Sequence, residues 1–370
     1  MAKESPNSQI NHLMANSAKS GIAIIGASGY GGLQAVKLLR DHPSFDIKFL
    51  GGERSVGQRW NEINPYLPIK EDLEIQQAVP NDIAAVAEYA ILSLPNGLAS
   101  KLVPELLERK VRVIDLSADY RYRSLTEWKK IYTQGGIHSE RNDDKLCGEA
   151  IYGLPEWNRE KISKARLVAS PGCYPTATLT AILPFLNQGL IETEGLIIDA
   201  KSGTSGGGRA AKEHLLLSEA SESICPYSVI GHRHTSEIEQ CATEIAGQKI
   251  IVQFTPHLVP MVRGILVTAY ARLRDPGITA EDCKIVLESI YKDQPFVEVL
   301  PVGIYPSTKW TRYTNKAYLS VQVDQRTGRL VIICSIDNLL KGQAGQAIQS
   351  LNIMSHNDEK LGLPAFTYFP

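Results

Sequence analysis

The spacing of hydrophobic and polar residues predicts alternating strands and helices over the first part of the chain. "GIAIIGAS" is a short apolar run that ends at a glycine turn, and "GGLQAVKLLRDHP" continues with Leu33, Val36 and Leu39 at helical spacing. Further strand-like runs are "DIKFLGG", "AEYAILSLP" and "VRVIDLSA". Strands separated by helical stretches are typical of a parallel sheet built from βαβ units.

The middle of the chain has a different pattern. Its strand-like runs are long, and few helical stretches separate them: "GLIIDAK", "KIIVQFTPHLVPMVRGILVTAYARL" and "AYLSVQVDQRTGRLVIICSID". "DQRTGR" suits a hairpin turn between two of these strands. We therefore expect a second, α+β domain on a largely antiparallel sheet.

The chain closes with "KGQAGQAIQSLNIM", whose alanine, isoleucine and leucine residues form a helical stripe. The change of pattern predicts a polar N-terminal tail over 1–20 and one domain made of 21–169 plus 336–370. It predicts the second domain over 170–335.

Composition and charge exclude several classes of function. The chain has 370 residues and a net charge of -1, so no basic surface for nucleic acid or anionic lipid is expected. No apolar run approaches the roughly 20 residues that span a bilayer, and the polar first residues lack the core of a secretory signal. The six cysteines show no CxxC pair or metal-ligand spacing, which predicts neither disulfides nor a metal and favours the cytoplasm.

"GASGYGG" lies directly between the first strand and the first helix. Glycines there let the backbone approach a pyrophosphate, and the helix start supplies unpaired N–H groups. The spacing is GxxGxxG or GxxGxG rather than GxGxxG, so a tight turn without a ligand is the alternative. Residues expected at the nucleotide are Gly26, Ser28, Gly29, Tyr30, Gly31 and Gly32.

The end of the second strand, "GGERS", bears on the choice of nucleotide. Arg54 and Ser55 suit a 2′-phosphate, whereas Glu53 suits a free 2′-hydroxyl. The residues alone leave both readings open.

Cys173 follows a Ser-Pro-Gly turn and begins a helical pattern in "SPGCYPTATLTAILPFL". A thiol at a helix N-terminus has its thiolate stabilised by the helix dipole and by free N–H groups, which makes it a better nucleophile. The alternative is a small buried hydrophobic residue.

A base for this thiol is offered by "VIGHRHTSEIEQ". Ser236 and Glu239 fit a capping box, which predicts that the helix starts after the histidines. In an extended segment His232 and His234 would face one site, with Arg233 on the opposite side. A pair of surface histidines is the alternative.

Two loops suit anionic groups. "KSGTSGGGR" contains Ser202 and Arg209 around a run of glycines after a strand, and such a loop presents N–H groups to phosphate or carboxylate. "LSADYR" ends a strand with Arg121, whose guanidinium forks onto a carboxylate. A flexible or ion-paired surface loop is the alternative for each.

Taken together, "GASGYGG", "LSADYR", "SPGCYPTA", "DAKSGTSGGGR", "GHRHTSEIEQ", "FTPHLVPMVRGI" and "IDNLLKGQAGQAIQ" closely resemble the N-acetyl-γ-glutamyl-phosphate reductases of arginine biosynthesis. The resemblance runs from about Gly21 to the C-terminus. It implies an α/β fold, with a Rossmann-type NADP(H) domain completed by the C-terminal helix. It also implies an inserted α+β domain for catalysis and homo-oligomer contacts, as a dimer or tetramer.

The resemblance assigns roles by position. Cys173 matches the nucleophile, and His232 is favoured for proton transfer over His234, although the two roles can exchange. Substrate contacts fall on Arg121, Ser202, Arg209 and His234. Cofactor contacts fall on Arg54, Ser55, Pro95, Asn96, Asn338 and Lys341, and NADP(H) is the implied cofactor. Asn96 stands in "LPNG" where the family often has LPHG.

The implied reaction converts an acyl phosphate into an aldehyde through a thioester on Cys173. Two alternatives remain open: a dehydrogenase for another semialdehyde such as aspartate semialdehyde, and an idle NADP(H)-binding regulatory protein. A catalytic thiolate would be alkylated quickly, whereas a structural cysteine would react slowly.

Overall fold

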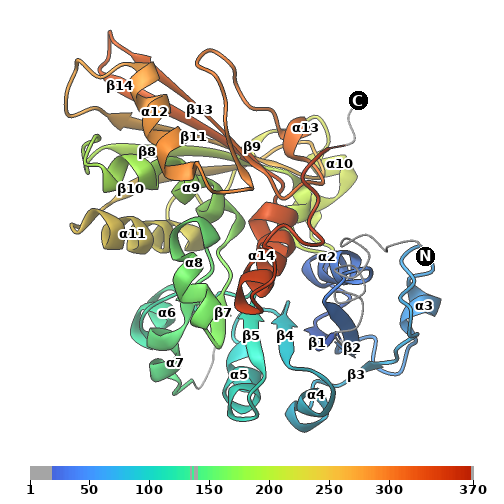
Figure 1. The fold of residues 1–370 in the computed structure, drawn as a ribbon. Coiled ribbons are helices and arrows are strands. Elements are labelled where there is room, and N and C mark those ends of the chain that lie inside the picture. Colours follow the sequence, from blue (N-terminus) through green and yellow to red (C-terminus); the bar gives the residue numbers. More distant parts are fainter. Residues whose placement is uncertain (1–18, 134–135, 137–140, 368–370) are drawn as a thin grey trace, which may run out of the picture.

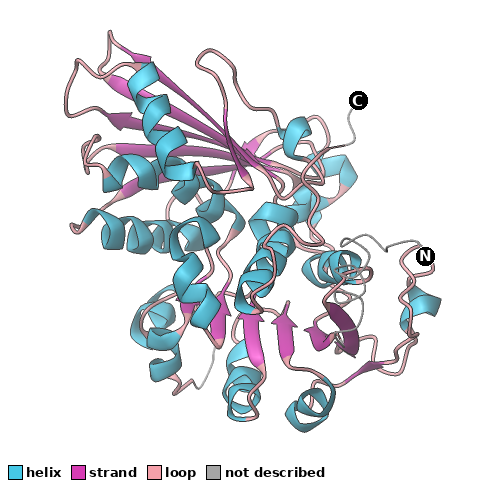
Figure 2. Cartoon of the chain, in the orientation of Figure 1, coloured by secondary structure: helices cyan, strands magenta, loops and turns pink. Residues whose placement is uncertain are grey.

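The computed structural model describes residues 19–133, 136 and 141–367. Two seven-stranded sheets organise these residues, a parallel sheet in the lower half of Figure 1 and a mixed sheet in the upper half. Helices flank both sheets, as Figure 2 shows.

The first sheet has the strand order β3-β2-β1-β4-β5-β7-β6, and every neighbouring pair is parallel. Its central strand β4 is buried along its whole length, as expected where helices cover both faces. The strands are β1 (Ser20–Ile25), β2 (Phe45–Gly51), β3 (Ile75–Gln76), β4 (Tyr89–Leu92), β5 (Arg112–Asp115), β6 (Ile151–Tyr152) and β7 (Leu167–Ala169). The helices between them are α2 (Tyr30–Leu39), α3 (Trp60–Ile63), α4 (Pro80–Val86), α5 (Ala99–Glu108), α6 (Leu125–Tyr132), α7 (Asp144–Glu149) and α8 (Pro155–Lys164). The predicted parallel sheet is confirmed.

The chain returns to this sheet at its end. A π-helical turn, η3 (Leu340–Ala344), leads into helix α14 (Gly345–Met354). Ile348 and Leu351 of α14 pack in one core with Ile22 and Ile24 of β1. The expected apolar stripe of the last helix therefore completes the core of the first sheet.

The second sheet has the order β12-β13-β14-β11-β8-β10-β9. Four of its pairings are antiparallel, whereas β8 with β10 and β12 with β13 are parallel, so the sheet is mixed. The predicted hairpin joins β13 to β14, and Asp324 pairs with Arg329 beside the turn. The strands are β8 (Leu196–Ser202), β9 (Cys225–Pro226), β10 (Val252–Leu258), β11 (Ile265–Arg272), β12 (Val297–Val299), β13 (Ala317–Asp324) and β14 (Arg329–Ile336).

Helix α9 (Cys173–Asn187) is buried on all sides beneath the second sheet, with Ala181 and Phe185 in one core with Val267 and Ile332. An apolar helix of this kind belongs in a protein core. The other helical segments of this part are α10 (Leu217–Ala220), α11 (Arg233–Ala246), α12 (Ala280–Tyr291), α13 (Thr308–Thr311) and the 3₁₀ turns η1 (Thr204–Gly207) and η2 (Glu213–Leu215).

The predicted N-terminal tail lies outside the described residues except for its last two positions. Ser20 already belongs to β1, so the sheet begins one residue earlier than the predicted boundary. Among the described residues, no helix combines the length and the apolar character needed to cross a bilayer.

Candidate active site

Cys173 is the first residue of α9, as the sequence predicts. The Ser-Pro-Gly turn follows β7 and ends in Gly172, whose extended backbone caps the helix. A Cβ on Gly172 would lie 2.5 Å from Nε2 of His234, so any other residue at this point would displace the imidazole. The turn therefore brings the backbone before the thiol directly against an imidazole.

Two cavities meet at this thiol. A first cavity of about 570 Å³ and a second of about 410 Å³ share Cys173, Arg121, Gly206 and His234 in their linings. Cys173 thus stands where a group bound in one cavity can meet a group bound in the other.

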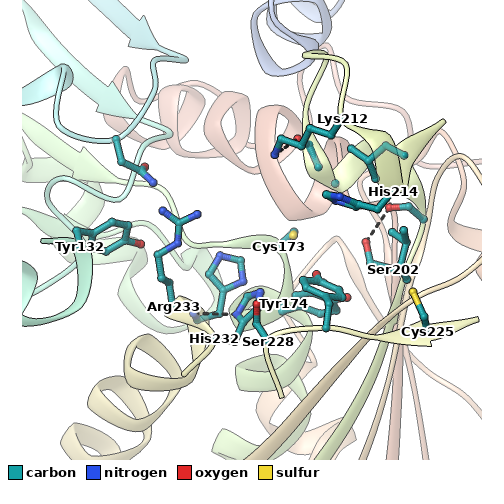
Figure 3. A pocket seen from close by; sticks show the side chains of 18 of the residues that line it. Tyr132, Cys173, Tyr174, Ser202, Lys212, His214, Cys225, Ser228, His232 and Arg233 are labelled. Carbon is teal, nitrogen blue, oxygen red and sulfur yellow. Dashed lines mark hydrogen bonds between the residues drawn. The ribbon is translucent and has the colours of Figure 1, made fainter. Parts of the chain in front are cut away.

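The first cavity is lined by polar, cationic and aromatic side chains (Figure 3). It contains the predicted residues His232, Ser202 and Asn96, although Asn96 was expected nearer the cofactor. Residues that the sequence analysis did not select are Tyr132, Tyr174, Lys212, His214, Cys225, Tyr227, Ser228 and Arg233. In Figure 3, Lys212 and His214 lie on one side of Cys173, and Arg233 and Tyr132 lie on the other.

The second cavity opens onto the glycine turn. Gly29, Tyr30 and Gly31 line it. Helix α2 starts there with no side-chain cap and no acidic residue in its first turn, so its N–H groups are free for an anion. Gly32 lets the turn close, because a Cβ there would lie 2.2 Å from the carbonyl oxygen of Gly26. The residues present fit a dinucleotide phosphate.

Arg209 was expected to contact the substrate, but it lines the second cavity and not the first. It donates to the carbonyl oxygen of Ser28 (2.6 Å), and the Ser28 hydroxyl lies 3.2 Å from the Ser55 hydroxyl. Arg54, which precedes Ser55 in the chain, is exposed. One guanidinium and two hydroxyls therefore lie together at the glycine turn.

The remaining predicted cofactor residues divide into two kinds. Pro95 and Asn338 line the second cavity. Lys341 is completely buried and its ammonium lies 2.6 Å from Glu156 and 2.8 Å from Gln349, so it contributes to the core instead of the cavity. Its place in the sequence three residues after Asn338 did not reveal that Asn338 lines the cavity whereas Lys341 pairs with Glu156.

The two histidines lie together, but the expected helix start was wrong. Helix α11 begins at Arg233, and Nδ1 of His232 accepts the backbone N–H of His234 at 3.1 Å. The imidazole itself thus caps the helix, in place of the predicted box at Ser236 and Glu239. The ring centroids are 4.9 Å apart and both rings line the first cavity, with Arg233 beside them rather than opposite.

Burial controls the ionisation of this group. It raises the pKa of Cys173 to about 11, and the nearby backbone N–H of Tyr174 offsets only part of that rise. Burial and the charge of Arg233 lower the pKa of His232 to about 4, and burial holds the pKa of His234 well below its usual range. In the free protein at neutral pH the thiol is protonated and both imidazoles are neutral, contrary to the expected thiolate.

Alkylation of the free protein tests this result. Because the thiolate is the reactive form and its pKa is raised, the iodoacetamide rate at Cys173 rises about tenfold per pH unit between about pH 7 and 10. Peptide mass spectrometry separates Cys173 from the exposed Cys225. A rate that is already constant above pH 7 would show that the helix start outweighs burial.

A buried carboxylate that the sequence analysis missed holds the site together. Glu237 is completely buried, and its Oε1 accepts the backbone N–H of Gly172 (2.9 Å) and the hydroxyl of Tyr152 (2.7 Å). Its Oε2 lies 3.2 Å from Arg121, which also donates to the carbonyl oxygen of Ser170. Helix α11 starts at Arg233, so Glu237 lies one turn into the helix. Had this helix start been predicted, Glu237 would have been a candidate residue of the site.

No group of three or more His, Cys, Asp or Glu side chains in the described ranges is arranged to hold a metal ion.

Comparison with known proteins places these features in a family. Residues 21–165 match the model of the semialdehyde dehydrogenase NAD binding domain, and residues 173–338 match that of the semialdehyde dehydrogenase dimerisation domain. The N-acetyl-gamma-glutamyl-phosphate reductase of Prochlorococcus marinus (strain MIT 9211) is 64% identical over 96% of this chain and 99% of its own length. That of Parasynechococcus marenigrum (strain WH8102) is 61% identical over 96% of this chain and 100% of its own length.

Solved structures show the same fold at low sequence identity. Aspartate semialdehyde dehydrogenase II of Vibrio cholerae, in complex with ASA, is 18% identical with a TM-score of 0.70, over 92% of this chain and 99% of that chain. Aspartate semialdehyde dehydrogenase of Candida albicans, with NADP, is 16% identical with a TM-score of 0.68, over 91% and 99% of the two chains. By its domains and its relatives, the chain belongs to the N-acetyl-gamma-glutamyl-phosphate reductases of the semialdehyde dehydrogenase family.

Proposed function

We propose that the protein reduces N-acetyl-γ-glutamyl phosphate to N-acetylglutamate 5-semialdehyde and phosphate, with NADPH as the reductant, in arginine biosynthesis. The observation that carries this proposal is the position of Cys173 at the junction of two cavities. One cavity holds cationic and imidazole side chains suited to an anionic acyl phosphate. The other opens onto a glycine turn suited to a dinucleotide.

NADP(H) fits the second cavity. The free N–H groups at the start of α2 would bind its pyrophosphate, with Pro95 and Asn338 along the same cavity. Arg54 and Ser55 would bind the 2′-phosphate, and the proximity of Arg209 to Ser28 supports this reading over the Glu53 alternative. NADPH supplies a hydride to the acyl carbon.

The first step forms a thioester on Cys173. Its sulfur attacks the acyl carbon, the bond from that carbon to the phosphate oxygen breaks, and phosphate leaves with the electron pair. The thiol proton passes through a neutral imidazole to the departing phosphate. His234 suits this transfer better than His232, because His234 lines both cavities and lies against Gly172, whereas Nδ1 of His232 accepts a backbone N–H.

The second step releases the aldehyde. Once the thioester carbon has been reduced, its oxygen carries a negative charge, which the backbone N–H groups at the start of α9 and the Nε2–H of His232 would stabilise. With Nδ1 acting as an acceptor, neutral His232 carries its proton on Nε2. The carbon–sulfur bond then breaks, and one proton from solvent restores the Cys173 thiol.

The second sheet suits a role in assembly. Residues that alternate with its core positions, such as Ile197, Thr268 and Val331, are half-buried or exposed on the face opposite α9. We propose that this face joins copies of the chain in a homodimer or homotetramer. All six cysteines are free thiols, which supports a cytoplasmic location.

A paired assay tests the substrate and the cofactor together. N-acetylglutamate semialdehyde and aspartate semialdehyde are each offered with phosphate and either NADP⁺ or NAD⁺, and NADPH or NADH formation is followed by absorbance. We expect turnover with N-acetylglutamate semialdehyde and NADP⁺ to exceed that of the other combinations. Preference for aspartate semialdehyde would refute the proposed substrate, and preference for NAD⁺ would refute the assignment of Arg54 and Ser55.

A further inference from the structure

We propose that Arg233 binds the α-carboxylate of the substrate, at the end of the first cavity that Tyr132 and Asn96 also line. The proposal rests on the proposed function, because it assigns one group of that substrate to one part of the cavity.

The guanidinium of Arg233 is available for an anion. It stands over the ring of Tyr132, with 5.3 Å between the guanidinium carbon and the ring centroid. In the described part of the chain no carboxylate forms an ion pair with it: Glu237 is paired with Arg121, and Glu244 with Arg123. A planar guanidinium supported by a buried aromatic ring and free of a protein carboxylate suits a ligand carboxylate.

The backbone at this position is fixed. The carbonyl oxygen of Arg233 accepts the hydroxyl of Tyr122 at 3.1 Å, and His232 caps the helix that Arg233 begins. No acidic residue lies in the first turn of α11. The helix start and the guanidinium therefore favour negative charge at the same place.

Arg121, the expected carboxylate partner, is largely committed within the protein. Its guanidinium donates to Glu237 and to the carbonyl oxygens of Ser170 (2.8 Å) and Leu116 (3.0 Å). It is also almost completely buried. These bonds make Arg121 part of the wall that supports α9, and leave Arg233 as the guanidinium with free donors.

The opposite side of the cavity suits the phosphate. Lys212 and His214 lie across Cys173 from Arg233 (Figure 3), beside Ser202 and the glycines of η1. An ammonium acts as a point charge and serves phosphate well, whereas a guanidinium matches the two oxygens of a carboxylate. The substrate carries its phosphate and its α-carboxylate at opposite ends of its carbon chain. These two groups can therefore bind on opposite sides of Cys173.

Asn96 adds a second donor at the Arg233 end. Its Oδ1 accepts the backbone N–H of Ala118 at 2.9 Å, which directs the amide NH₂ away from that loop. The NH₂ group lines the cavity with Arg233 and suits a carboxylate oxygen or the acetamide oxygen of the substrate. Asn96 thus supplies a hydrogen-bond donor at this place.

The test compares two aldehydes that differ only in the α-carboxylate: N-acetylglutamate semialdehyde and 4-acetamidobutanal. In the Arg233→Gln variant we expect kcat/KM to fall about 100-fold for the first aldehyde and to change less than about threefold for the second. Arg233→Lys should recover part of the loss, because it keeps the charge without the fork. The acids N-acetylglutamate and 4-acetamidobutyrate, used as competitive inhibitors, give the same comparison without turnover.

Arg326→Gln is the matched control, since Arg326 lies in the exposed β13–β14 turn. It should leave both aldehydes unchanged. An equal loss on both aldehydes in Arg233→Gln, or no loss on either, overturns the proposal. Failure of the unaltered protein to oxidise N-acetylglutamate semialdehyde would instead refute the proposed function, so the two failures are distinguishable.

Discussion

Replacing Cys173 with alanine is expected to lower phosphate-dependent oxidation of N-acetylglutamate semialdehyde by at least about 10⁴-fold. The thiol is the group at the junction of the two cavities that can form an acyl intermediate. Without the thiol, no covalent acyl intermediate can form between the substrate site and the cofactor site. NADPH formation, followed by absorbance with saturating aldehyde and phosphate, measures the loss.

NADPH binding is the control for this variant. The start of α2 and the glycine turn do not depend on the sulfur, so the NADPH dissociation constant should stay within about threefold of that of the unaltered protein. Substantial turnover in Cys173→Ala, with NADPH binding intact, would mean that hydride reaches the substrate without a thioester. The proposed mechanism would then be wrong.

Replacing Glu237 with leucine is expected to lower the free energy of unfolding by about 3–5 kcal/mol. The substitution leaves the buried Arg121 without its carboxylate partner and leaves the N–H of Gly172 and the hydroxyl of Tyr152 without an acceptor. Catalysis should fall as well, because the Gly172 contact fixes the backbone directly before the thiol. Urea unfolding followed by circular dichroism measures the stability change.

Glu244→Leu is the control on the same helix. Glu244 pairs with Arg123 at the surface, where both side chains are about two-fifths exposed, so its loss should cost about 0–1 kcal/mol. If the two variants unfold at the same urea concentration, the buried network around Glu237 does not stabilise the protein as argued.

Most of the fold was predicted from the regular spacing of apolar residues and from the turn residues between elements. The strand-turn-helix unit of β1 and α2 was predictable because a β-branched run, a set of glycines and a helical stripe follow each other without interruption. The hairpin of β13 and β14 was predictable from its turn residues. The parallel pairing of β8 with β10 was not, because it joins strands far apart in the chain whose local patterns carry no sign of their partner.

The sequence predicted that Cys173, His232 and His234 share one site, and the structure brings them together, but the sequence did not predict the local geometry. Cys173 and the two histidines were found from their positions, whereas the start of α11 was wrong because a histidine imidazole supplies the cap that serine usually supplies. The pKa of the thiol was expected to fall, and burial, which local sequence does not reveal, raises it instead. Lys341 lies in a segment that resembles the family's cofactor-binding segment. Its ammonium nevertheless pairs with Glu156, a residue distant in sequence.

The contacts of η3 and α14 with α9 have a consequence for how the protein is made. A Cβ on Gly342 would lie 2.9 Å from the Cβ of Cys173, and Gln346 donates to the Thr176 hydroxyl at 3.0 Å. Because a ribosome delivers the chain from its N-terminus, Cys173 emerges long before these partners do. The nascent chain therefore carries the thiol before Asn338, Gly342 and Gln343, which line the second cavity, have been made.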